Sequence, residues 1–393
     1  MKEIYLDNAA TTKPLPKVVE VINEYLTKKW HNPSSQSSAA ININGDIEAV
    51  RKLIKRDIGA APEDDIIFTS GGSEANCLAI EGFLKYYTEM DRDSFFVDVS
   101  ATEIEHSSII KCIKNWGDTV DVTVNKSGEI NFADLELYCR SISNIKGHFL
   151  ISIQFANNEI GTIQDIKVIS KMVHEVGGLL HVDAVQAYPS VKIDVNELGI
   201  DMMSVSGHKF GCPKGIGFLY KKACVDIDPI IYGSQNKGLR GGTENVPYIM
   251  GMGKTVEMLM EKRSENTHYT YDLWKYLEFQ LKEHHIGSLL ASPQHRLSTI
   301  FPIAFFDEGF TAEGLMYYLN IYGIHVSVGA ACDSSSGESS HVLKAIGLSE
   351  NKSKQVLRVS FSPDNTKEDI NELVKRMIEY KAIVKGDARG VIK

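Results

Sequence analysis

Two residues in the middle of the chain have the types and positions needed to hold a reactive aromatic aldehyde. Lys209 stands among serine, histidine and glycine residues in the segment Ser204–Gly215, directly after an apolar run. Asp183 ends an earlier apolar run. Ligands of parallel sheets lie at the carboxyl ends of strands, so a lysine past one strand and an acid ending another can face one crevice. A lysine that forms a Schiff base and an acid that keeps a pyridinium nitrogen protonated are the groups that pyridoxal 5'-phosphate (PLP) requires.

A glycine turn offers a candidate site for the phosphate of such a cofactor. The segment Thr69–Glu74 places Gly71 and Gly72 between a predicted strand and a predicted helix. Backbone N–H groups and the helix dipole favour an anion there, and glycine lets the backbone approach closely. Arg240–Thr243 is a second candidate of the same kind. Each is a weak signal alone, because glycine turns at helix starts are common.

One cysteine has the sequence context of a nucleophile. The chain has six cysteines without a CxxC pair or zinc-like spacing, so we predict no metal site. Five are interpreted as reduced, mostly buried thiols. Cys332 differs, because it follows Gly329–Ala331 and precedes the serine-rich segment Ser334–Ser340, which is predicted to be a mobile loop. A thiolate on such a loop can travel to a substrate and attack it.

The elements that must position these groups alternate between strand and helix from about residue 65 to residue 220. Strands are predicted at Ile66–Phe68, Phe95–Val99, Phe149–Ile153 and Leu179–Val182, and helices from Ser73, at Ser107–Trp116 and at Asp165–Val176. Asp165 is the predicted N-cap of the last helix, and Gly177 its stop. This alternation predicts an α/β fold with a mostly parallel sheet covered on both faces.

A smaller α+β region is predicted after Gly253. Its helices are expected at Val256–Lys262 and Tyr271–Lys282, from Thr311, at His341–Ile346 and from Thr366, and its strands near Ser298–Phe305, His325–Val328 and Val356–Phe361. A chain of 393 residues is long enough for two hydrophobic cores, so we expect two packed domains.

Composition argues against several functional classes. Hydrophobic residues make up 43% and charged residues 24% of the chain, as in ordinary globular proteins. The formal net charge is -9 with no lysine or arginine block, so no nucleic-acid groove is predicted. No apolar run suits a membrane span or a secretory signal. A dinucleotide-binding oxidoreductase shares the sheet architecture, but no convincing GxGxxG turn follows a first strand.

Taken together, the motifs resemble those of the NifS/IscS-like cysteine desulfurases, which are PLP-dependent members of the class V aminotransferase family. The resemblance covers nearly the whole chain, and the joint order of the motifs is far more specific than any one of them. The matching segments are Tyr5–Thr12, Asn32–Ser35, Phe68–Glu74, Glu105–His106, Asn157–Gly161, His181–Asp183 with Gln186, Gly207–Lys209, Pro213–Gly215, Arg240–Pro247, Gly329–Cys332, His341–Gly347 and Leu357–Arg358.

The resemblance implies a fold and a domain division. The fold would be that of the PLP-dependent aminotransferases (fold type I), with a mostly parallel seven-stranded sheet in the large domain and a smaller α+β domain. Residues 14–255 would form the large PLP-binding domain. Residues 1–13 and 256–393 would form the small domain that carries the cysteine loop.

The resemblance also implies roles for the matching side chains. The implied cofactor contacts are Lys209 through a Schiff base, Asp183 on the pyridine nitrogen, Gln186 on the ring hydroxyl, His106 stacked on the ring, Asn158 beside the cofactor, Gly72, Ser73, Ser206 and His208 at the phosphate, and Thr243 at the phosphate of the other subunit. The implied substrate contacts are Asn158, Arg358 and Asn32. The planar fork of an arginine suits a carboxylate. The implied catalytic residues are Lys209, His106 and Cys332.

The implied activity is that of a cysteine desulfurase, which converts L-cysteine to L-alanine. Lys209 or His106 would remove the α-proton, and Cys332 would take the sulfur as a persulfide. The loop would then deliver it to an acceptor protein, such as an iron–sulfur scaffold or a thiolation partner. The protein would be a cytoplasmic homodimer without a nucleic-acid or membrane partner. A selenocysteine lyase, another class V lyase or transaminase, and a non-catalytic scaffold of this fold stay open as alternatives.

The sequence departs from the common family pattern at four places. Gly72–Ser73 replaces the usual Ala–Thr of the phosphate turn, and the retained hydroxyl predicts that phosphate binding survives. Gln36–Ser37 stands where a histidine is often found. Cys212 occupies a glycine position and is interpreted as a small filling residue. The acidic, glycine-containing loop after Cys332 predicts altered mobility or a different acceptor protein.

Overall fold

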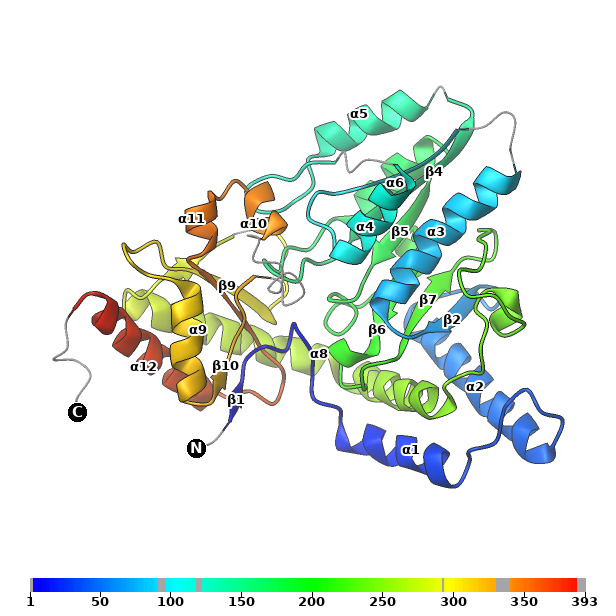
Figure 1. Cartoon of the computed structure of the whole chain (residues 1–393), viewed down its shortest axis with the longest axis horizontal. Coiled ribbons are helices and arrows are strands. Elements are labelled where there is room, and N and C mark those ends of the chain that lie inside the picture. The colour runs from blue at the N-terminus through cyan, green and yellow to red at the C-terminus, as the bar shows by residue number, and fades with distance from the viewer. Residues whose placement is uncertain are drawn as a thin grey trace.

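The computed structural model describes residues 3–90, 96–117, 122–143, 145–291, 293–329 and 340–386. A larger sheet with its helices forms one part of the molecule, and a smaller sheet with the C-terminal helices forms the other (Figure 1). One long helix, α8, runs through both parts, and the N-terminal segment crosses between them.

The larger sheet carries the strand ends at which the predicted site lies. Its strands are β2 (Asp65–Thr69), β3 (Phe96–Ala101), β4 (Gly147–Gln154), β5 (Leu179–Asp183), β6 (Met202–Ser206) and β7 (Gly217–Lys221), in the order β2-β7-β6-β5-β4-β3. Strands β3 to β6 are parallel, and β7 is antiparallel to both of its neighbours. Seven strands were expected, and the described residues form six. Beside β3, where a further strand would lie, there is an isolated parallel bridge between Thr102 and Val122.

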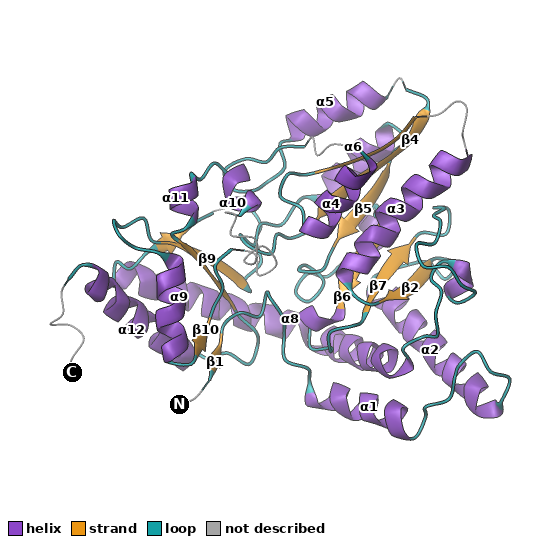
Figure 2. Ribbon diagram, viewed as in Figure 1, coloured by secondary structure: helices purple, strands orange, loops and turns teal. Residues whose placement is uncertain are grey.

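Helices cover both faces of this sheet (Figure 2). They are α1 (Pro16–Thr27), α2 (Ser38–Asp57), α3 (Gly72–Met90), α4 (Ser107–Trp116), α5 (Phe132–Ile142), α6 (Ile166–Glu175) and the short α7 (Val195–Leu198). The buried side chains of α3 and α4 form one hydrophobic cluster, and those of α1, α2, α5 and α6 belong to another. The predicted start of α6 is confirmed, because the side chain of Asp165 accepts a hydrogen bond from the backbone of Val168.

Helix α8 (Val246–Glu283) is a single element where two helices were predicted. At roughly 1.5 Å per residue it extends about 57 Å. Its first half packs closely on α1 and α2, since a Cβ built on Gly251 would lie 2.8 Å from Ile22 Cγ1 and one on Gly253 would lie 2.6 Å from Val50 Cγ2. Its second half contributes Leu273 and Leu277 to the core of the smaller part. The buried face therefore changes partners along one uninterrupted helix.

The smaller part is built on an antiparallel sheet in which β9 (Ile300–Ala304) lies between β8 (Ser288–Leu289) and β11 (Val356–Ser360). Its helices are α9 (Ala312–Ile321), α10 (His341–Ala345), α11 (Glu350–Ser353) and α12 (Lys367–Val384). The predicted helix from Thr366 is confirmed, and Thr366 and Asp369 form a capping box at its start. The strand expected at His325–Val328 is present only as the short β10 (Ile324–His325).

The N-terminal segment connects the two parts. Strand β1 (Ile4–Tyr5) pairs in parallel with β10, and Ala9 N donates to Ser360 Oγ at 2.8 Å. Thr12 then donates from its backbone to the carbonyl of His208, next to Lys209. Ile4 and Leu6 belong to the hydrophobic core of the smaller part, whereas Ala9 belongs to that of the larger. The domain division after residues 13 and 255 remains a prediction.

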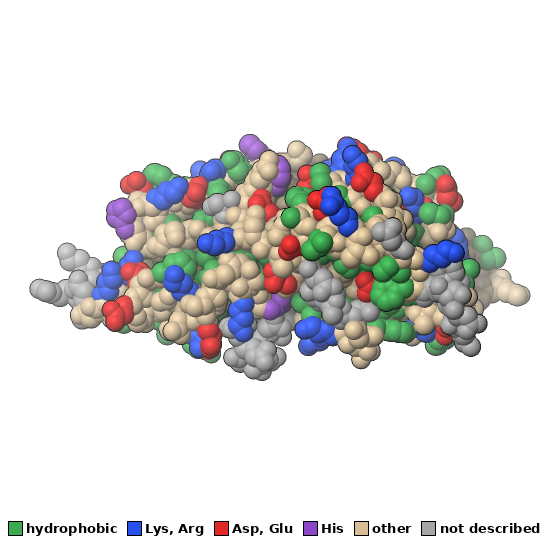
Figure 3. Space-filling model, turned by 90° about the horizontal axis from the view of Figure 1, so that it is seen from above, with side chains coloured by type: hydrophobic (Ala, Val, Ile, Leu, Met, Phe, Trp, Pro, Cys, Tyr) green, Lys and Arg blue, Asp and Glu red, His purple; other side chains and the backbone are tan. Residues whose placement is uncertain are grey.

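Among the described residues, no helix is long and apolar enough to cross a membrane. On the face shown in Figure 3, lysine and arginine side chains are interspersed with aspartate and glutamate.

Candidate active site

Lys209 lies in the turn that follows β6. The strand ends at Ser206, and Gly207–Lys209 form a single turn of 3₁₀ helix. Lys209 Nζ donates to the carbonyls of Ala9, at 2.6 Å, and Ala10, at 3.0 Å. Gln186 Nε2 donates to the same Ala9 oxygen at 3.0 Å. The N-terminal segment thus holds the lysine and the glutamine side by side, and both also line a cavity of about 820 Å³.

Asp183 is the last residue of β5 and is buried, with 2% of its surface exposed. Its Oδ1 accepts from the backbone of Val185 at 3.0 Å, and its Oδ2 accepts from Asn76 Nδ2 at 2.9 Å. Strand β5 pairs with β6, so Asp183 lies in register with Ser204, just before the Lys209 turn. The expected lysine and acid are therefore brought to neighbouring strand ends.

A chain of hydrogen bonds links Asp183 to His106. Asn76 Nδ2 also donates to Ser108 Oγ, at 3.1 Å, and Ser108 Oγ lies 2.8 Å from His106 Nδ1. His106 is the N-cap of α4 and accepts from the backbone of Ser108. Both amide hydrogens of Asn76 are thus used to connect α3, α4 and the end of β5. This arrangement fixes the orientation of the imidazole relative to the carboxylate.

Glu105 precedes His106, and its pKa is strongly shifted. Burial raises its pKa to about 8, and the negative charge of Asp183 adds to the effect. Its Oε1 accepts from Thr102 Oγ1, and its Oε2 has no hydrogen-bond partner among the described residues. His341 Nε2, at the start of α10, contacts the carbonyl of Glu105 at 2.9 Å. Glu105 is therefore protonated at neutral pH, and its backbone ties α10 of the smaller part to the His106 segment.

Three of the predicted phosphate residues, Gly72, Ser73 and Ser206, lie at the N-terminus of α3. A Cβ built on Gly72 would lie 2.7 Å from Val185 Cγ2 and 3.3 Å from Ser206 Cβ, so the helix start and the end of β6 nearly touch. Ser73 is exposed on the first turn of this helix. The first turn of a 19-residue helix offers free backbone N–H groups to an anion. Glycine replaces the usual alanine at residue 72 for a local reason: Val185 fills the space that an alanine methyl group would need.

His208 is neutral in this structure. Burial lowers its pKa to about 4, and the positive charges of Lys209 and Lys214 act in the same direction. Its Nδ1 lies 3.1 Å from Thr11 Oγ1. The imidazole can therefore donate a hydrogen bond to an anion without adding charge.

Arg358 and Asn158, the predicted carboxylate site, are in contact. Arg358 Nη1 donates to the Asn158 carbonyl at 3.0 Å, and Nη2 pairs with Asp7 Oδ1 at 2.8 Å. Its Nε has no partner among the described residues, although the side chain is only 3% exposed. A buried guanidinium with an unused donor suits a carboxylate ligand.

Cys332 lies outside the described residues, but both ends of its segment are described. A Cβ built on Gly329 would lie 3.8 Å from Ser340 Cβ and 3.8 Å from Glu159 Oε2. Ser340 Oγ donates to Glu159 Oε2 at 2.7 Å. Glu159 follows Asn158, so both ends of the segment meet next to the carboxylate site.

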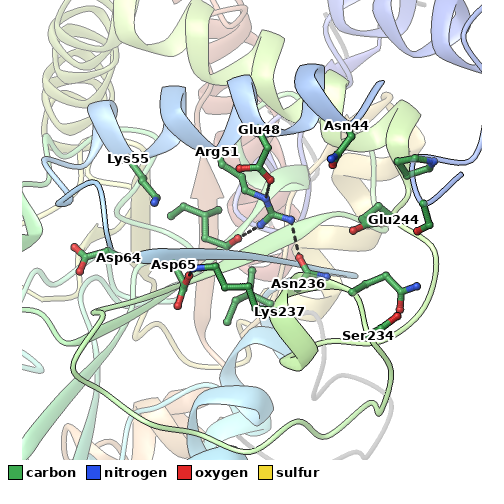
Figure 4. Close-up of a pocket in the computed structure, with 15 residues that line it drawn as sticks. Asn44, Glu48, Arg51, Lys55, Asp64, Asp65, Ser234, Asn236, Lys237 and Glu244 are labelled. Carbon is green, nitrogen blue, oxygen red and sulfur yellow. Dashed lines mark hydrogen bonds and ion pairs between the residues drawn. The ribbon is translucent and has the colours of Figure 1, made fainter. Parts of the chain in front are cut away.

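Two predicted site residues are not brought to this cluster by the single chain. Thr243 is exposed. Asn32 is also exposed and accepts from the backbone of Ser34 at 2.9 Å. Ser34 lines a different hollow of about 330 Å³ (Figure 4), across which Arg51 points from α2 towards Asn236.

The sequence reasoning missed several positioning residues: Asp7, Ala9, Asn76, Glu105, Ser108 and Glu159. Asn76 had a detectable signal, since it is a polar residue in the otherwise apolar stretch Ala75–Ile80 of a helix that begins at the glycine turn. Ala9 had none, because it acts only through its carbonyl oxygen.

The donor set fits PLP. It combines a primary amine, a buried carboxylate on the neighbouring strand, an imidazole linked to that carboxylate through Ser108 and Asn76, and a helix N-terminus. Lys209, Asp183, His106 and the first turn of α3 would hold the amine, pyridine, ring-face and phosphate ends of the cofactor.

Comparison with known proteins agrees with this geometry. The model of the family "Aminotransferase class-V" matches residues 4–373. The cysteine desulfurase IscS of Methanosarcina thermophila is 38% identical over 379 residues, which cover 95% of this chain and 91% of that protein. A solved NifS-like protein superposes with a TM-score of 0.87 at 29% identity, over 97% of this chain and 100% of that one. The protein SspA, solved in complex with cysteine, gives a TM-score of 0.78 at 30% identity, over 93% and 100% of the two chains.

The match extends across both parts of the molecule and includes the strand ends at which Lys209 and Asp183 lie. The chain belongs to the class V aminotransferase family and, with it, to the enzymes that use PLP.

Proposed function

We propose that this protein is a cysteine desulfurase, which converts L-cysteine to L-alanine and collects the sulfur on Cys332. The observation that carries the proposal is that two clusters are linked through Gln154, which lies in register with Asp183 and donates to Asn158 Oδ1 at 3.2 Å. Lys209 and Asp183 lie at neighbouring strand ends, and the two ends of the Cys332 segment meet at Glu159, beside the Arg358–Asn158 contact. Relatives over nearly the whole chain bear the name cysteine desulfurase, and the related SspA binds cysteine.

Binding and orientation of the substrate would depend on Arg358. Its fork matches a carboxylate, and the Asn158 backbone and Asp7 already fix the plane of the guanidinium. The substrate carboxylate would take the free Nε and replace or share the contact with Asp7. This contact would orient the bound cysteine through its carboxylate.

Proton transfer would depend on Lys209, with His106 as the second candidate. PLP, when bound, withdraws electrons from the α-carbon and makes its proton removable. Asp183 would keep the ring nitrogen protonated, and the Asn76–Ser108 chain would hold His106 against the ring. Lys209 would move the α-proton, because its amine is free once the substrate amine has replaced it.

Sulfur transfer would then depend on the Cys332 thiolate, which attacks the sulfur atom of the bound substrate. The bond between that sulfur and the substrate carbon breaks, and the substrate leaves as alanine. Cys332 comes three residues after Gly329, so a fully extended chain would place it up to about 10 Å from this fixed point.

Two other kinds of function are compatible with the same residues. A selenocysteine lyase, or another class V lyase or transaminase, would use the same lysine, acid and arginine, and rates on cysteine, selenocysteine and simple amino acids separate them. The presence of the lysine, the acid, the arginine and the cysteine argues against a non-catalytic scaffold. Purification of a colourless protein without PLP would support the scaffold function.

We further propose a cytoplasmic homodimer with two domains divided after residues 13 and 255. Thr243 and Asn32, both exposed in the single chain, would act at or near the site of the other subunit. The sulfur acceptor would be an iron–sulfur scaffold or a thiolation partner.

The decisive experiment is incubation of the PLP-loaded protein with L-cysteine, followed by mass spectrometry of the Cys332 peptide. We expect the peptide to gain one sulfur atom, and alanine to form. Cys332→Ser should keep the colour of bound PLP and lose catalytic alanine release. Normal turnover of cysteine by that variant would reject Cys332 as the acceptor.

A second variant tests the lysine. Borohydride treatment should fix PLP covalently on the wild-type protein at Lys209 and fail to do so on Lys209→Ala. Covalent retention of PLP by Lys209→Ala would reject the assignment of this residue.

A further inference from the structure

Two thiols outside the proposed site face each other across the α3–α4 contact. Cys77 Sγ on α3 lies 2.8 Å from Cys112 Sγ on α4. Cys112 is buried, whereas Cys77 is half-buried and within reach of small molecules in solvent. Glu81, one turn after Cys77 on the same helix, accepts a weak hydrogen bond from Cys112 Sγ at 3.6 Å. Neither thiol has a part in the proposed sulfur transfer.

The two thiols differ in their ionisation. A hydrogen bond from Cys112 lowers the pKa of Cys77. The contact with Cys77 and burial raise the pKa of Cys112, and the charge of Glu81 adds to this effect. One partner is thus favoured as a thiolate and the other as a thiol, which is the asymmetry between an attacking and a resolving cysteine.

From this geometry we propose that Cys77 and Cys112 form a reversible disulfide when the protein meets a peroxide. The Cys77 thiolate attacks one oxygen of hydrogen peroxide, the O–O bond breaks, and Cys77 becomes a sulfenic acid as one water leaves. Cys112 then attacks the Cys77 sulfur, the S–O bond breaks, and a second water carries away the proton of Cys112 through Glu81. Two thiols and one peroxide give one disulfide and two waters, and a dithiol reductant restores the pair.

The distance favours a disulfide over a metal site. Cys77, Glu81 and Cys112 offer three ligand atoms within 4.8 Å of one another. Tetrahedral zinc with sulfur bonds of about 2.3 Å would hold two thiolates about 3.8 Å apart, which requires these sulfurs to separate. A disulfide of about 2.05 Å requires them to approach, and 2.8 Å is nearer to that bond.

The disulfide would affect the cofactor site, because Cys77 and Cys112 lie on the same two helices as the residues whose hydrogen bonds orient His106. Cys77 follows Asn76, and Cys112 lies one helical turn after Ser108. Asn76 and Ser108 form the link between Asp183 and His106. A covalent clamp between α3 and α4 would hold this link together, and PLP should then leave the oxidised protein more slowly.

The test uses the full-length, PLP-loaded protein with Cys332→Ser, so that peroxide cannot act on that residue. After treatment with hydrogen peroxide and alkylation, non-reducing peptide mapping should find Cys77 linked to Cys112. Free thiols titrated in denaturant should fall by two, and dithiothreitol should restore them. Adding Cys77→Ser or Cys112→Ser should each abolish the link. Adding Cys139→Ser should preserve it, because that thiol is buried on α5 and burial raises its pKa to about 11.

Several results would overturn the proposal. These are the absence of the linked peptide, a fall of two free thiols on peroxide treatment of the Cys77→Ser protein, or stoichiometric zinc that protects both thiols and is lost in either variant. Equal rates of PLP release from oxidised and reduced protein would overturn the coupling to the cofactor site. Because peptides, thiols and PLP release are measured rather than alanine formation, this test stands apart from that of the desulfurase activity.

Discussion

At the scale of single residues, the buried polar groups around Asp183 are held by one another. Asn76 uses both of its amide hydrogens, and the protonated Glu105 lies beside the imidazole that this network orients. Such networks fix geometry when satisfied, and an unpaired member is costly. The pKa of Glu105 therefore reports how completely water is excluded from this region.

Glu105→Gln should change the pH dependence of stability. The folded protein keeps the proton of Glu105 between its ordinary pKa of 4.5 and about 8, while the unfolded chain loses it. The contribution is fully present below pH 4.5 and is lost as the pH rises towards 8, with a slope of roughly 1.4 kcal/mol per pH unit. Urea unfolding across this range should show the slope in the wild type and a flatter curve in Glu105→Gln. Equal slopes would contradict the raised pKa.

Arg358→Lys should impair substrate binding more than turnover. Lysine keeps the charge and loses the planar fork, so KM for cysteine should rise about tenfold or more, with a smaller fall in kcat. Steady-state kinetics check this split. Arg376→Lys is a matched control, because Arg376 pairs with Glu372 and Glu379 on α12, and its KM should equal that of the wild type. An unchanged KM in Arg358→Lys would exclude this arginine from carboxylate binding.

At the scale of elements, the start of α3 depends on one tight contact with the turn after β5. The Val185 methyl group occupies the volume that a side chain at residue 72 would need, and a β-branched side chain cannot rotate away freely. The glycine at this position thus sets how closely the helix N-terminus approaches Ser206. The phosphate turn and the Asp183 strand end are therefore a single packed unit.

Gly72→Ala should weaken PLP binding, because the added methyl group pushes α3 away from Val185. Val185→Ala in the same chain should restore most of the affinity by making room. Titration of the apoprotein with PLP, followed by absorbance, measures both. Loss of affinity that Val185→Ala does not rescue would show that the contact is not the cause.

Local signals predicted some of the helices that begin after a capping residue, but not α2, α5 or α7, which are also capped. Helix α4 has the predicted bounds, and α6 and α12 begin directly after their N-cap residues, Asp165 and Thr366. The continuity of α8 could not be read from periodicity, because its apolar face rotates from α1 and α2 to the smaller core. In the candidate site, Lys209 and Asp183 were identifiable from residue type, whereas the lysine's acceptors are backbone carbonyls that no residue type reveals.

At the scale of the whole molecule, a buried ion pair fastens α8 to the larger part. Arg263 donates to both carboxylate oxygens of Asp57, at 2.9 and 2.7 Å, and Lys192 contacts the same residue. Burial acts to raise the pKa of Asp57, but the hydrogen bond and charge of Arg263 outweigh it and lower the pKa. Because α8 continues into the smaller part, this ion pair also helps to hold the two parts in place relative to each other.

Arg263→Ala should destabilise the protein by about 3–5 kcal/mol, because it removes both of its hydrogen bonds to the buried Asp57 carboxylate and leaves, among the described residues, only the exposed Lys192, 3.6 Å away, as the ionic partner of Asp57. Denaturant unfolding measures the loss. Lys262→Ala, on the exposed side of the same helix turn, should change stability by no more than about 0.5 kcal/mol. A loss in Arg263→Ala no larger than in Lys262→Ala would show that the pair contributes little.

The crossing of the N-terminal segment between the two parts has a consequence for biosynthesis. Ala9, whose carbonyl receives Lys209, is itself anchored to Ser360, a residue 351 positions later. On the ribosome the segment around Ala9 must wait for β11 before it can take its place. Loading of the coenzyme should therefore follow the synthesis of β11, and nascent chains halted before that strand emerges should remain colourless.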